Sequence, residues 1–562
     1  MGLEMPSGAH FNQFMFYDLD EDGKAELFIK TSDGTTTYKP NARGKFDMTD
    51  ESTIVSYIGD KSVVPGTNID GNGHVNSKSN EYVTVFNGLT GEEINTIDYV
   101  NTTGDYGDWG KSGDGGNRSA RYNIAIAYLP KDQSDANCTE TIPAVLFNRG
   151  YYGKTTVAAY TLRDGKLQLE WNFVVPSGDE NASKGNHNVA TGDVDQDGFD
   201  ELVMGAIAID HDGTVLWVNN GKDGRDFGGH GDSIHLAAMN PGSNNLYVFS
   251  PQEEKSTATM NQALYNAGTG TRIGGSWFSS KDVGRGVAAN ITSNPGFESW
   301  ATSDGSGIYG FDGTLLNSSR SVVSCNWRIY WDGDLLDELA DGAGTEGNMT
   351  ITKYNETSGS SNTLITFEGT KMCNSTKNTP SLVADLFGDW REEAVLRNED
   401  DTELRIYMTT EETRYMIYTL MHDPVYRNAV ANQNTSYNQP PHLGVYLGED
   451  NKSDVTNMKL ATANIKYPGT EGKPAPTAKP LVVPVATATT APTAAPTTAP
   501  TTAPESSATA APTTAPTSAP ASSGSVNNDS SSGSLTWLWI VIGVVVVAGG
   551  AAFVVLKGKK KK

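Results

Sequence analysis

The chain of 562 residues is poor in cysteine, in basic side chains and, before residue 535, in long apolar runs. Its three cysteines, Cys138, Cys325 and Cys373, are an odd number and lie far apart, so they indicate neither a disulfide framework nor a zinc site. Lys and Arg number 42 against 67 Asp and Glu, which gives a net charge of −25. A chain this acidic does not bind nucleic acid by neutralising phosphates, so its carboxylates are either solvated or hold cations.

A secretory signal is also absent from the start of the sequence. The opening residues, MGLEMPSGAHFNQF, have neither a basic n-region nor an apolar h-region. The first strand-like run begins almost at once, at about Phe11, which is typical of a start inside a domain. An apolar segment near the C-terminus, described below, requires export of the chain. We therefore expect that this sequence lacks its N-terminal part.

Glycine and aromatic residues are abundant, and they favour strands over helices. The chain has 60 Gly, 10 Trp, 23 Tyr and 17 Phe, a composition that indicates a large all-β body and excludes a helical bundle. Glycine-containing turns lead into apolar strands at intervals of about 50 residues over much of the body. These turns are Asn87–Gly91, Asp164–Gly165, Asp212–Gly213, Ala267–Gly270 and Asp312–Gly313. Such a period predicts a β-propeller of about seven to eight blades, with a β-helix of shorter repeats as the competing architecture.

An apolar segment near the C-terminus predicts one transmembrane helix. Residues 535–556 carry no charge over 22 positions, enough at about 1.5 Å per residue to cross a hydrocarbon core of about 30 Å. Trp537 and Trp539 suit an interfacial belt at one end, and the basic residues 557–562 follow at the other. This asymmetry places the C-terminus in the cytoplasm and the rest of the chain outside, at the cell surface. A buried core helix is the alternative.

A stretch rich in Pro, Thr, Ala and Ser precedes this segment and contains repeated TTAP units. It cannot bury enough apolar surface to fold, and its prolines keep it extended, so it predicts a disordered stalk. The chain therefore divides into a folded body over residues 1–467, the stalk over 468–534, the membrane span over 535–556 and a cytoplasmic tail over 557–562.

Two segments of the body share the pattern D-x-D-x-D-G-x-x-E and run into strand-like stretches. Alternate carboxylates on a turn opened by glycine direct their oxygens at one centre, which is the hard-ligand cage that calcium prefers. The predicted ligands are Asp18, Asp20, Asp22 and Glu26 in the first copy and Asp193, Asp195, Asp197 and Glu201 in the second. An EF-hand is disfavoured, because Ile29 and Met204 stand at its twelfth position.

A third, weaker copy keeps the first, fifth and ninth positions of the pattern as Asp385, Asp389 and Glu393. For all three copies the alternative is a solvated acidic turn. Because the loops precede strands, we expect their calcium ions to be structural and to clamp the turn that starts each blade.

Longer phrases in the body are more specific than these loops. They run in order from AHFNQFMFYDLDEDGKAE at residue 9, through GNHNVATGDVDQDGFDE, GHGDSIH, DVGRGVAA and YWDGDLL, to LFGDWREEAV, YTLMHDPVYR and YNQPPHLGVYLG, which ends at residue 448. On these phrases the chain resembles the rhamnogalacturonan lyases of polysaccharide lyase family eleven, calcium-rich eight-bladed propellers that cleave the backbone of rhamnogalacturonan I. Members of that family usually start earlier, with an additional β-domain and a first blade, and the resemblance implies that both are absent here.

The resemblance implies a lyase that acts at galacturonic acid, with endo action favoured over exo. Such an enzyme removes the weakly acidic proton on C5, expels the oxygen on C4 and leaves an unsaturated uronic acid. The neighbouring carboxylate must be neutralised, which calcium or an arginine can do. Bound cations also allow an acidic protein to hold a polyanion.

The resemblance points to Arg285 and Lys377 as the charged pair of the cleft. We favour Lys377 as the base and Arg285 as the carboxylate clamp or acid-side donor, because a guanidinium resists deprotonation whereas the pKa of a lysine among other cations can fall. Without the resemblance, each reads as an exposed basic residue in a loop. The expected sugar contacts are Asn374, Ser375, Thr376, Asn434, Ser436 and Tyr437. Their alternative role is that of turn-forming polar residues.

His187, His230 and Asp232 belong to the catalytic calcium region that the resemblance implies, and all three are candidate metal residues. Imidazole is a poor calcium ligand, so the chemistry favours Asp232 as the ligand and the two histidines as orienting groups. A second interpretation makes a histidine the general base, and a third has both histidines satisfied inside glycine-flanked turns. Tyr151 and Tyr152 are expected to belong to the core.

These observations predict a surface-anchored β-propeller that cleaves rhamnogalacturonan I, a pectic polysaccharide, by calcium-assisted β-elimination. The rival interpretation is a non-catalytic, calcium-loaded propeller that binds pectin or a cell-surface partner and is tethered by the same stalk.

Overall fold

The structure is a computed structural model that describes residues 9–62, 80–102, 106, 121–219, 230–253, 262–276, 283–302, 307–433, 435, 437–449, 542–547 and 550–555. Within these residues almost all regular structure is strand, and a single α-helix occurs, α1 (Pro424–Asn432). The prediction of an all-β body is confirmed.

Seven antiparallel sheets of four strands make up the described body. The first sheet is β1 (Phe14–Tyr17), β2 (Glu26–Ser32), β5 (Glu81–Asn87) and β6 (Glu93–Asp98). The second is β7 (Tyr122–Pro130), β8 (Thr141–Arg149), β9 (Thr155–Arg163) and β10 (Lys166–Val175). The third is β11 (Gly185–Gly192), β12 (Glu201–Gly205), β13 (Ile207–Ile209) and β14 (Val215–Val218). The fourth is β15 (His235–Ala237), β16 (Tyr247–Pro251), β17 (Gln262–Asn266) and β18 (Arg272–Ser276).

The remaining three sheets follow the same plan. The fifth is β19 (Gly286–Ala289), β20 (Glu298–Ala301), β21 (Ile308–Tyr309) and β22 (Leu315–Asn317). The sixth is β23 (Trp327–Ile329), β24 (Glu338–Gly342), β25 (Met349–Asn355) and β26 (Ser360–Thr366). In the seventh, β29 (Glu393–Asn398) pairs with β27 (Thr370–Lys371), β28 (Leu382–Ala384) and β30 (Leu404–Tyr407).

Short elements connect the sheets. A two-stranded ribbon of β3 (Thr36–Tyr38) and β4 (Ile54–Tyr57) extends the connection between β2 and β5. Five 3-10 turns are described: η1 (Ala9–Phe11), η2 (Glu51–Thr53), η3 (Arg320–Val322), η4 (Ser375–Lys377) and η5 (Leu420–His422). The helix α1 begins at the N-cap Asp423, whose side chain accepts from the backbone of Val425, and has proline in its first turn.

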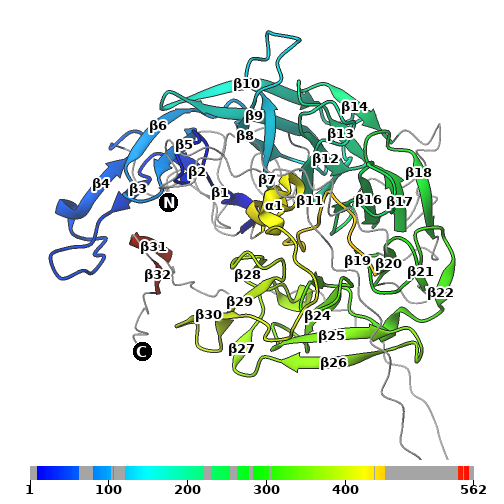
Figure 1. Cartoon of the computed structure of the whole chain (residues 1–562). Helices are drawn as coiled ribbons and strands as arrows, with labels where there is room; N and C mark the ends of the chain where they lie inside the picture. Colours follow the sequence, from blue (N-terminus) through cyan, green and yellow to red (C-terminus); the bar gives the residue numbers. More distant parts are fainter. Residues whose placement is uncertain are drawn as a thin grey trace, which may run out of the picture.

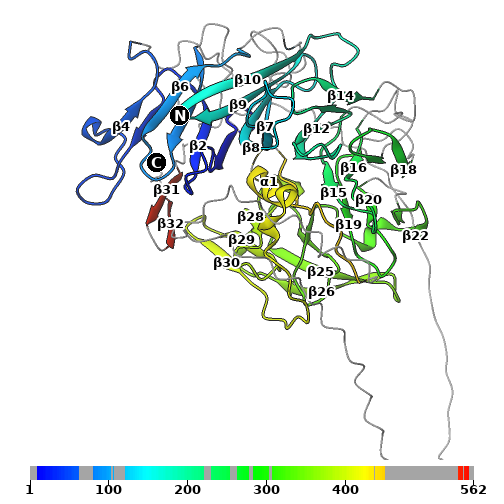
Figure 2. The same cartoon turned by 45° about the horizontal axis from the view of Figure 1, so that its top comes forward.

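The sheets follow one another around α1 in chain order (Figure 1). The helix contacts β1, β7, β11 and β28, and Figure 2 shows it between β7 and β28. Apolar side chains of neighbouring sheets pack against each other, as Phe28 and Phe147 do with ring centroids 5.8 Å apart between the first and second sheets. Each sheet therefore completes its core against the next one, since a single four-stranded sheet cannot bury both faces.

The five predicted glycine turns are confirmed, and each joins the third strand of a sheet to the fourth. At Asp164 and Gly165 both central residues have positive φ, 50° and 70°. This backbone matches the twist of the flanking strands and favours Asp-Gly over other pairs.

The carboxylate loops join the first and second strands of a sheet. The first copy lies between β1 and β2, the second between β11 and β12 and the third between β28 and β29. Because antiparallel strands alternate in direction, these loops share one end of each sheet with the glycine turns. The opposite end holds the starts of the first strands, and the candidate active site lies there.

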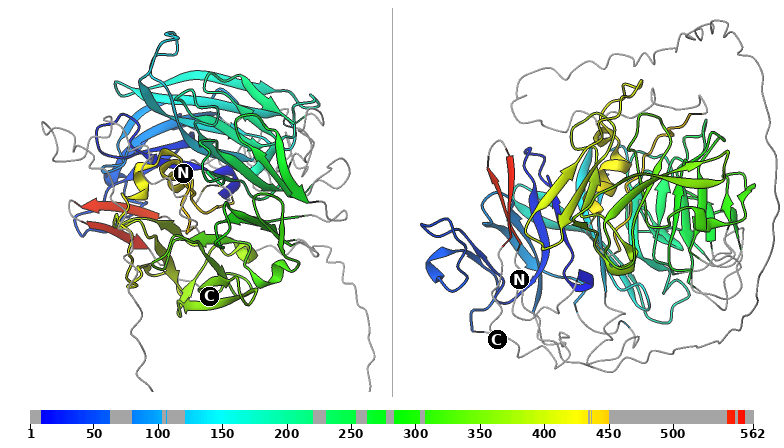
Figure 3. Two further views of the ribbon diagram at one scale, coloured as in Figure 1. Left: turned by 45° about the vertical axis from the view of Figure 1, so that its right-hand side comes forward. Right: turned by 90° about the horizontal axis from the view of Figure 1, so that it is seen from below.

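The transmembrane helix expected over residues 535–556 is not what the structure shows. Within the described residues, no helix is both long and apolar enough to cross a membrane. Instead β31 (Ile542–Val547) and β32 (Gly550–Val555) pair with each other inside this range, and Figure 3 shows them in red. An apolar run of this length can form either a membrane helix or strands, and its composition alone does not decide between them. The β-branched valines in it favour strands.

Candidate active site

The candidate residues come from four different sheets. His187 is in β11, Asp232 lies three residues before β15, and Arg285 directly precedes β19. Lys377 is in η4, within the loop that separates β27 from β28. Contacts of β11 with β15 and of β16 with β19 bring the starts of these strands together. Four side chains far apart in sequence thus gather at one end of the sheets.

Lys377 is the most accessible charged group of this cluster. Its Nζ lies 3.1 Å from Asp232 Oδ2, and 24% of its side chain is exposed. The same Nζ lies 4.4 Å from the centre of the Tyr437 ring, a cation–π contact. The buried carboxylate and the ring hold the amine in place while leaving it open to a ligand.

Arg285 is buried, with 3% exposed. Its Nη2 donates to the backbone carbonyls of Asn326 (3.0 Å) and Asn438 (3.4 Å), whereas Nε and Nη1 are buried without a hydrogen-bond partner. Burial lowers the pKa of Arg285 to about 10, although Asp232 and Asp341 act to raise it. The guanidinium is therefore cationic at neutral pH and has donors to offer.

His187 is enclosed by aromatic side chains. Its ring stacks on Tyr437 with centroids 4.2 Å apart, and the hydroxyls of Tyr151 and Tyr152 lie 3.1 Å from Nδ1 and 2.8 Å from Nε2. Burial, with His230 and nearby cations, moves the pKa of His187 far below its ordinary value. The two tyrosines, expected in the core, thus also orient a residue of the cluster.

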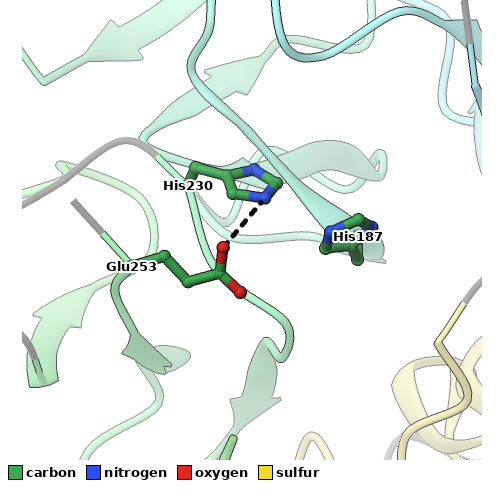
Figure 4. A group of neighbouring side chains, drawn as sticks. All are labelled: His187, His230 and Glu253. Carbon is green, nitrogen blue, oxygen red and sulfur yellow. Dashed lines mark ion pairs between the residues drawn. The ribbon is translucent and has the colours of Figure 1, made fainter. Parts of the chain in front are cut away.

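The carboxylate of Glu253 lies beside His187 and His230. Nitrogen or oxygen atoms of His187, His230 and Glu253 all lie within 4.8 Å of one another, and His230 Nε2 is 3.6 Å from Glu253 Oε2 (Figure 4). His187 Nε2 is also 3.6 Å from Asp232 Oδ1. Sequence analysis missed Glu253, which lies two residues after the end of β16 and belongs to no recognisable motif.

The expected sugar contacts lie around Lys377 as far as they are described. Asn374 and Ser375 have positive φ, 65° and 57°, and a bridge between Cys373 and Thr379 closes their loop. Asn374 Nδ2 is buried without a hydrogen-bond partner, and Ser375 and Thr376 are exposed. Asn434 and Ser436 lie outside the described residues.

The two full carboxylate loops bring their aspartates together. Carboxylate oxygens of Asp18, Asp20 and Asp22 lie within 4.8 Å of one another, and those of Asp193, Asp195 and Asp197 do the same. The ninth-position glutamates are buried behind the loops: Glu26 Oε2 accepts from Leu19 N (2.9 Å) and Glu201 Oε2 from Val194 N (2.8 Å). The clustered oxygens fit a hard cation, and calcium binding itself stays a prediction.

One side chain at the second loop was missed from the sequence. His211 Nδ1 lies 2.7 Å from Asp210 Oδ1, 3.1 Å from Asp197 Oδ2 and 3.8 Å from Glu201 Oε1. The neighbouring carboxylates of Glu201, Asp197 and Asp210 raise the pKa of His211 to about 9. An imidazolium therefore offsets part of the negative charge of this loop.

The third copy makes other contacts. Asp385 accepts backbone N–H groups of Gly388 (2.8 Å) and Leu420 (2.9 Å), and Asp389 pairs with Arg391 at 2.7 Å. Glu393 Oε2 accepts from Leu386 N at 2.8 Å. Among the described residues, these three carboxylates do not have oxygens that all lie within 4.8 Å of one another. Their role as metal ligands stays a prediction.

A fourth carboxylate group lies between β23 and β24, and sequence analysis did not find it. Lys353 Nζ, from β25, lies 2.5 Å from Asp332 Oδ2, 2.5 Å from Asp334 Oδ2 and 2.9 Å from Glu338 Oε1. Glu338 is 0% exposed and accepts from Trp331 N at 2.9 Å. Here an ammonium of the chain neutralises the clustered carboxylates.

Comparison with known proteins identifies relatives over most of the chain. A family model described as "Rhamnogalacturonan lyase family 11, C-terminal domain" matches residues 1–457. The sequence is 41% identical over 454 residues to the rhamnogalacturonan endolyase YesW of Bacillus subtilis (strain 168), which covers 80% of this chain and 65% of that protein. It is 41% identical over 462 residues to the rhamnogalacturonan exolyase YesX of the same organism, which covers 80% and 68%.

A solved structure shares the fold. The crystal structure of YesW superposes with a TM-score of 0.68 at 40% identity and covers 83% of this chain and 71% of that one. The chain thus spans about two thirds of the length of its relatives.

Stability of the metal-free protein should fall as pH rises from about 4.5 to about 8. Burial raises the pKa of Glu26 to about 7 and of Glu201 to about 8, so the folded state retains protons that the unfolded state has released. A state that binds more protons is favoured at low pH, and each such group loses its contribution as pH passes its folded pKa. Melting temperatures measured in EDTA should therefore decrease over this window, and added calcium should raise them more at pH 8 than at pH 5. A flat profile would contradict the prediction.

Lys353→Met should destabilise the protein by about 3–5 kcal/mol, because it leaves buried Glu338 and two neighbouring carboxylates without their cation. Urea unfolding with and without calcium measures the effect, and calcium should recover part of it. The control is Lys131→Met, which removes an exposed pair with Glu140 and should leave the melting temperature unchanged. Equal midpoints for the two variants would show that Lys353 does not stabilise this turn.

Proposed function

Because the chain belongs to rhamnogalacturonan lyase family 11, we propose that it cleaves rhamnogalacturonan I by β-elimination at galacturonic acid. The observation that carries the proposal is the accessible Lys377 amine held beside buried Asp232, with the Arg285 guanidinium near the same carboxylate. The Cβ that Gly284 lacks would lie 3.6 Å from Asp232 Oδ2, so the backbone leading into Arg285 runs beside Asp232. One cluster then holds a base and a cation for the substrate carboxylate.

Lys377 is the proposed general base. Removing the C5 proton requires a group within hydrogen-bond reach that can be neutral when the sugar is bound, and a partly exposed amine in a polar loop meets the geometric condition. His187 is a weaker candidate, because burial keeps its pKa far below neutral and tyrosine hydroxyls lie against both ring nitrogens. A base needs a pKa nearer to the working pH.

Arg285 is the proposed clamp for the carboxylate of galacturonic acid. Its buried Nε and Nη1 have no hydrogen-bond partner and can donate to that carboxylate as charge develops on it. A guanidinium shields this charge without exchanging its own proton, which leaves proton removal to Lys377. The sugar hydroxyls are then expected to meet Asn374, Ser375, Thr376 and Tyr437.

Calcium is the proposed cofactor. The oxygens of Glu253 and Asp232, with the imidazoles of His187 and His230, form a donor set that fits a divalent cation, and the carboxylates provide the hard ligands that calcium prefers. When bound there, calcium supplies positive charge that neutralises the substrate carboxylate. The Asp18 and Asp193 loops, at the opposite end of the sheets, are proposed structural calcium sites.

We infer that the seven four-stranded sheets are blades of a β-propeller, on the basis of their order around α1 and their similarity to a solved lyase. Endo action stays the proposal although the two B. subtilis relatives, one endo and one exo, are equally identical to this chain. Location at the cell surface also stays a proposal: a polysaccharide is too large to import, and residues 468–534 suit a stalk.

The rival function is a calcium-loaded module that binds pectin without cleaving it. It predicts the same folded body and the same metal loops but no bond cleavage. The presence of Lys377 beside Asp232 favours the enzyme.

Lys377→Ala should lower kcat about 10²–10⁴-fold, the range for loss of a general base. The measurement is the ultraviolet absorbance of the conjugated double bond formed when the full chain acts on rhamnogalacturonan I. Lys371→Ala, a half-buried lysine in β27, is the matched control and should keep kcat. Unchanged turnover in Lys377→Ala would reject the role of this amine as the base. If the unaltered chain produced no absorbance, the rival function, binding without cleavage, would be supported instead.

Chelation should abolish elimination and lower the melting temperature, and calcium should restore both. Magnesium at the same concentration should restore little, because it demands a smaller octahedral site and retains its waters. Elemental analysis of the chelated protein provides the control for complete removal. Full activity in a sample shown to be free of metal would reject a role for calcium in the reaction.

A further inference from the structure

Asp341 is the second-last residue of β24. It binds Asn326, the residue that precedes β23. Asn326 Nδ2 donates to Asp341 Oδ1 over 2.9 Å. The backbone carbonyl of the same Asn326 accepts from Arg285 Nη2 over 3.0 Å. Asn326 is thus joined to Asp341 through its side chain and to Arg285 through its backbone, so Asp341 restrains the carbonyl that holds the guanidinium.

The other side of Asp341 leads to Lys377. Asn378 directly follows Lys377, is 2% exposed and has a φ of 42°. Its Nδ2 donates to the carbonyls of Gly342 (2.7 Å) and Gly344 (3.0 Å). The N–H of the same Gly342 donates to Asp341 Oδ1 over 2.7 Å, so Gly342 joins Asp341 to Asn378. A left-handed, buried asparagine persists only where its surroundings over-determine it, so these bonds fix the end of the loop that carries Lys377.

We propose that Asp341 is a positioning residue that, through Asn326 and Gly342, sets the spacing between the Arg285 guanidinium and the Lys377 amine. The inference rests on the proposed function, since it concerns the same pair of groups. Oδ1 of Asp341 accepts from Asn326, whose carbonyl holds Arg285. It also accepts from Gly342, whose carbonyl holds Asn378 beside Lys377. Asp341 therefore acts on the two charged groups through Asn326 and Gly342.

Asp341→Ala should lower kcat about 10²-fold, the cost of misplacing a catalytic group by about 1 Å, while KM changes less because the sugar contacts remain. Asp341→Asn keeps one acceptor for Asn326 and should restore part of the loss. Adding Asp341→Ala to the double variant Arg285→Ala/Lys377→Ala should cause no further loss of kcat, because a positioning effect vanishes when both positioned groups are gone. A further loss would overturn the proposal.

Asp33→Ala is the matched control. Asp33 in the first sheet is a buried carboxylate that accepts from Asn80 Nδ2 over 2.9 Å and from Asp60 N over 2.7 Å, far in sequence from the site. Its removal should lower the melting temperature and leave kcat of the folded protein unchanged. A kcat loss as large as that of Asp341→Ala would attribute both losses to general destabilisation and would overturn the positioning role.

Acetylation of Lys377 gives a readout that does not depend on turnover. Acetic anhydride labelling, followed by peptide mass spectrometry, should modify Lys377 about threefold faster in Asp341→Ala than in the unaltered chain, because its loop opens more readily, with exposed Lys131 as the internal reference. Equal labelling would overturn the proposal. Faster labelling in a chain that shows no elimination would reject the proposed function and support the link to Lys377.

Discussion

Negative charge buried at the turn between the first and second strands is the constraint on which most of this structure depends. Five glutamates share one geometry there: Oε2 of each accepts the backbone N–H of the residue seven positions earlier, at 2.8 to 2.9 Å. They are Glu26, Glu201, Glu298, Glu338 and Glu393. One or two backbone amides do not balance a buried carboxylate, so each turn needs a proton, a further donor or a cation besides.

The turns meet this need in different ways. Lys353 supplies an ammonium at Glu338, His211 an imidazolium beside Glu201, and Thr292 only a hydroxyl, 2.5 Å from Glu298. The first loop has three clustered aspartates and fits a metal. The same backbone turn therefore accommodates a lysine ammonium, an imidazolium, a neutral hydroxyl donor or a cluster of aspartates beside its buried glutamate.

The candidate active site lies at the opposite end of the sheets from the buried glutamates, so it does not have to balance their charge. Antiparallel strands place the carboxylate turns at one end and the starts of the first strands at the other. Lys377, Arg285 and His187 meet at the second end, where loops from four sheets converge. Carboxylates at the first end belong to the strand turns, whereas Lys377 and Arg285 at the second end are the proposed substrate contacts.

Local patterns in the sequence determined the strands, the glycine turns and the two aspartate loops, because neighbours along the chain make the contacts that form them. The apolar segment at 535–556 shows the limit of local composition, since valine runs suit strand and helix alike and the structure has β31 and β32. Lys377 and Asp232 are 145 positions apart and come from different sheets, and Lys353 and Glu338 are 15 positions apart on paired strands of one sheet. Strand pairing and the packing of sheets bring such residues within bonding distance, so the tertiary structure alone decided which carboxylates have a cation and which side chains surround the site.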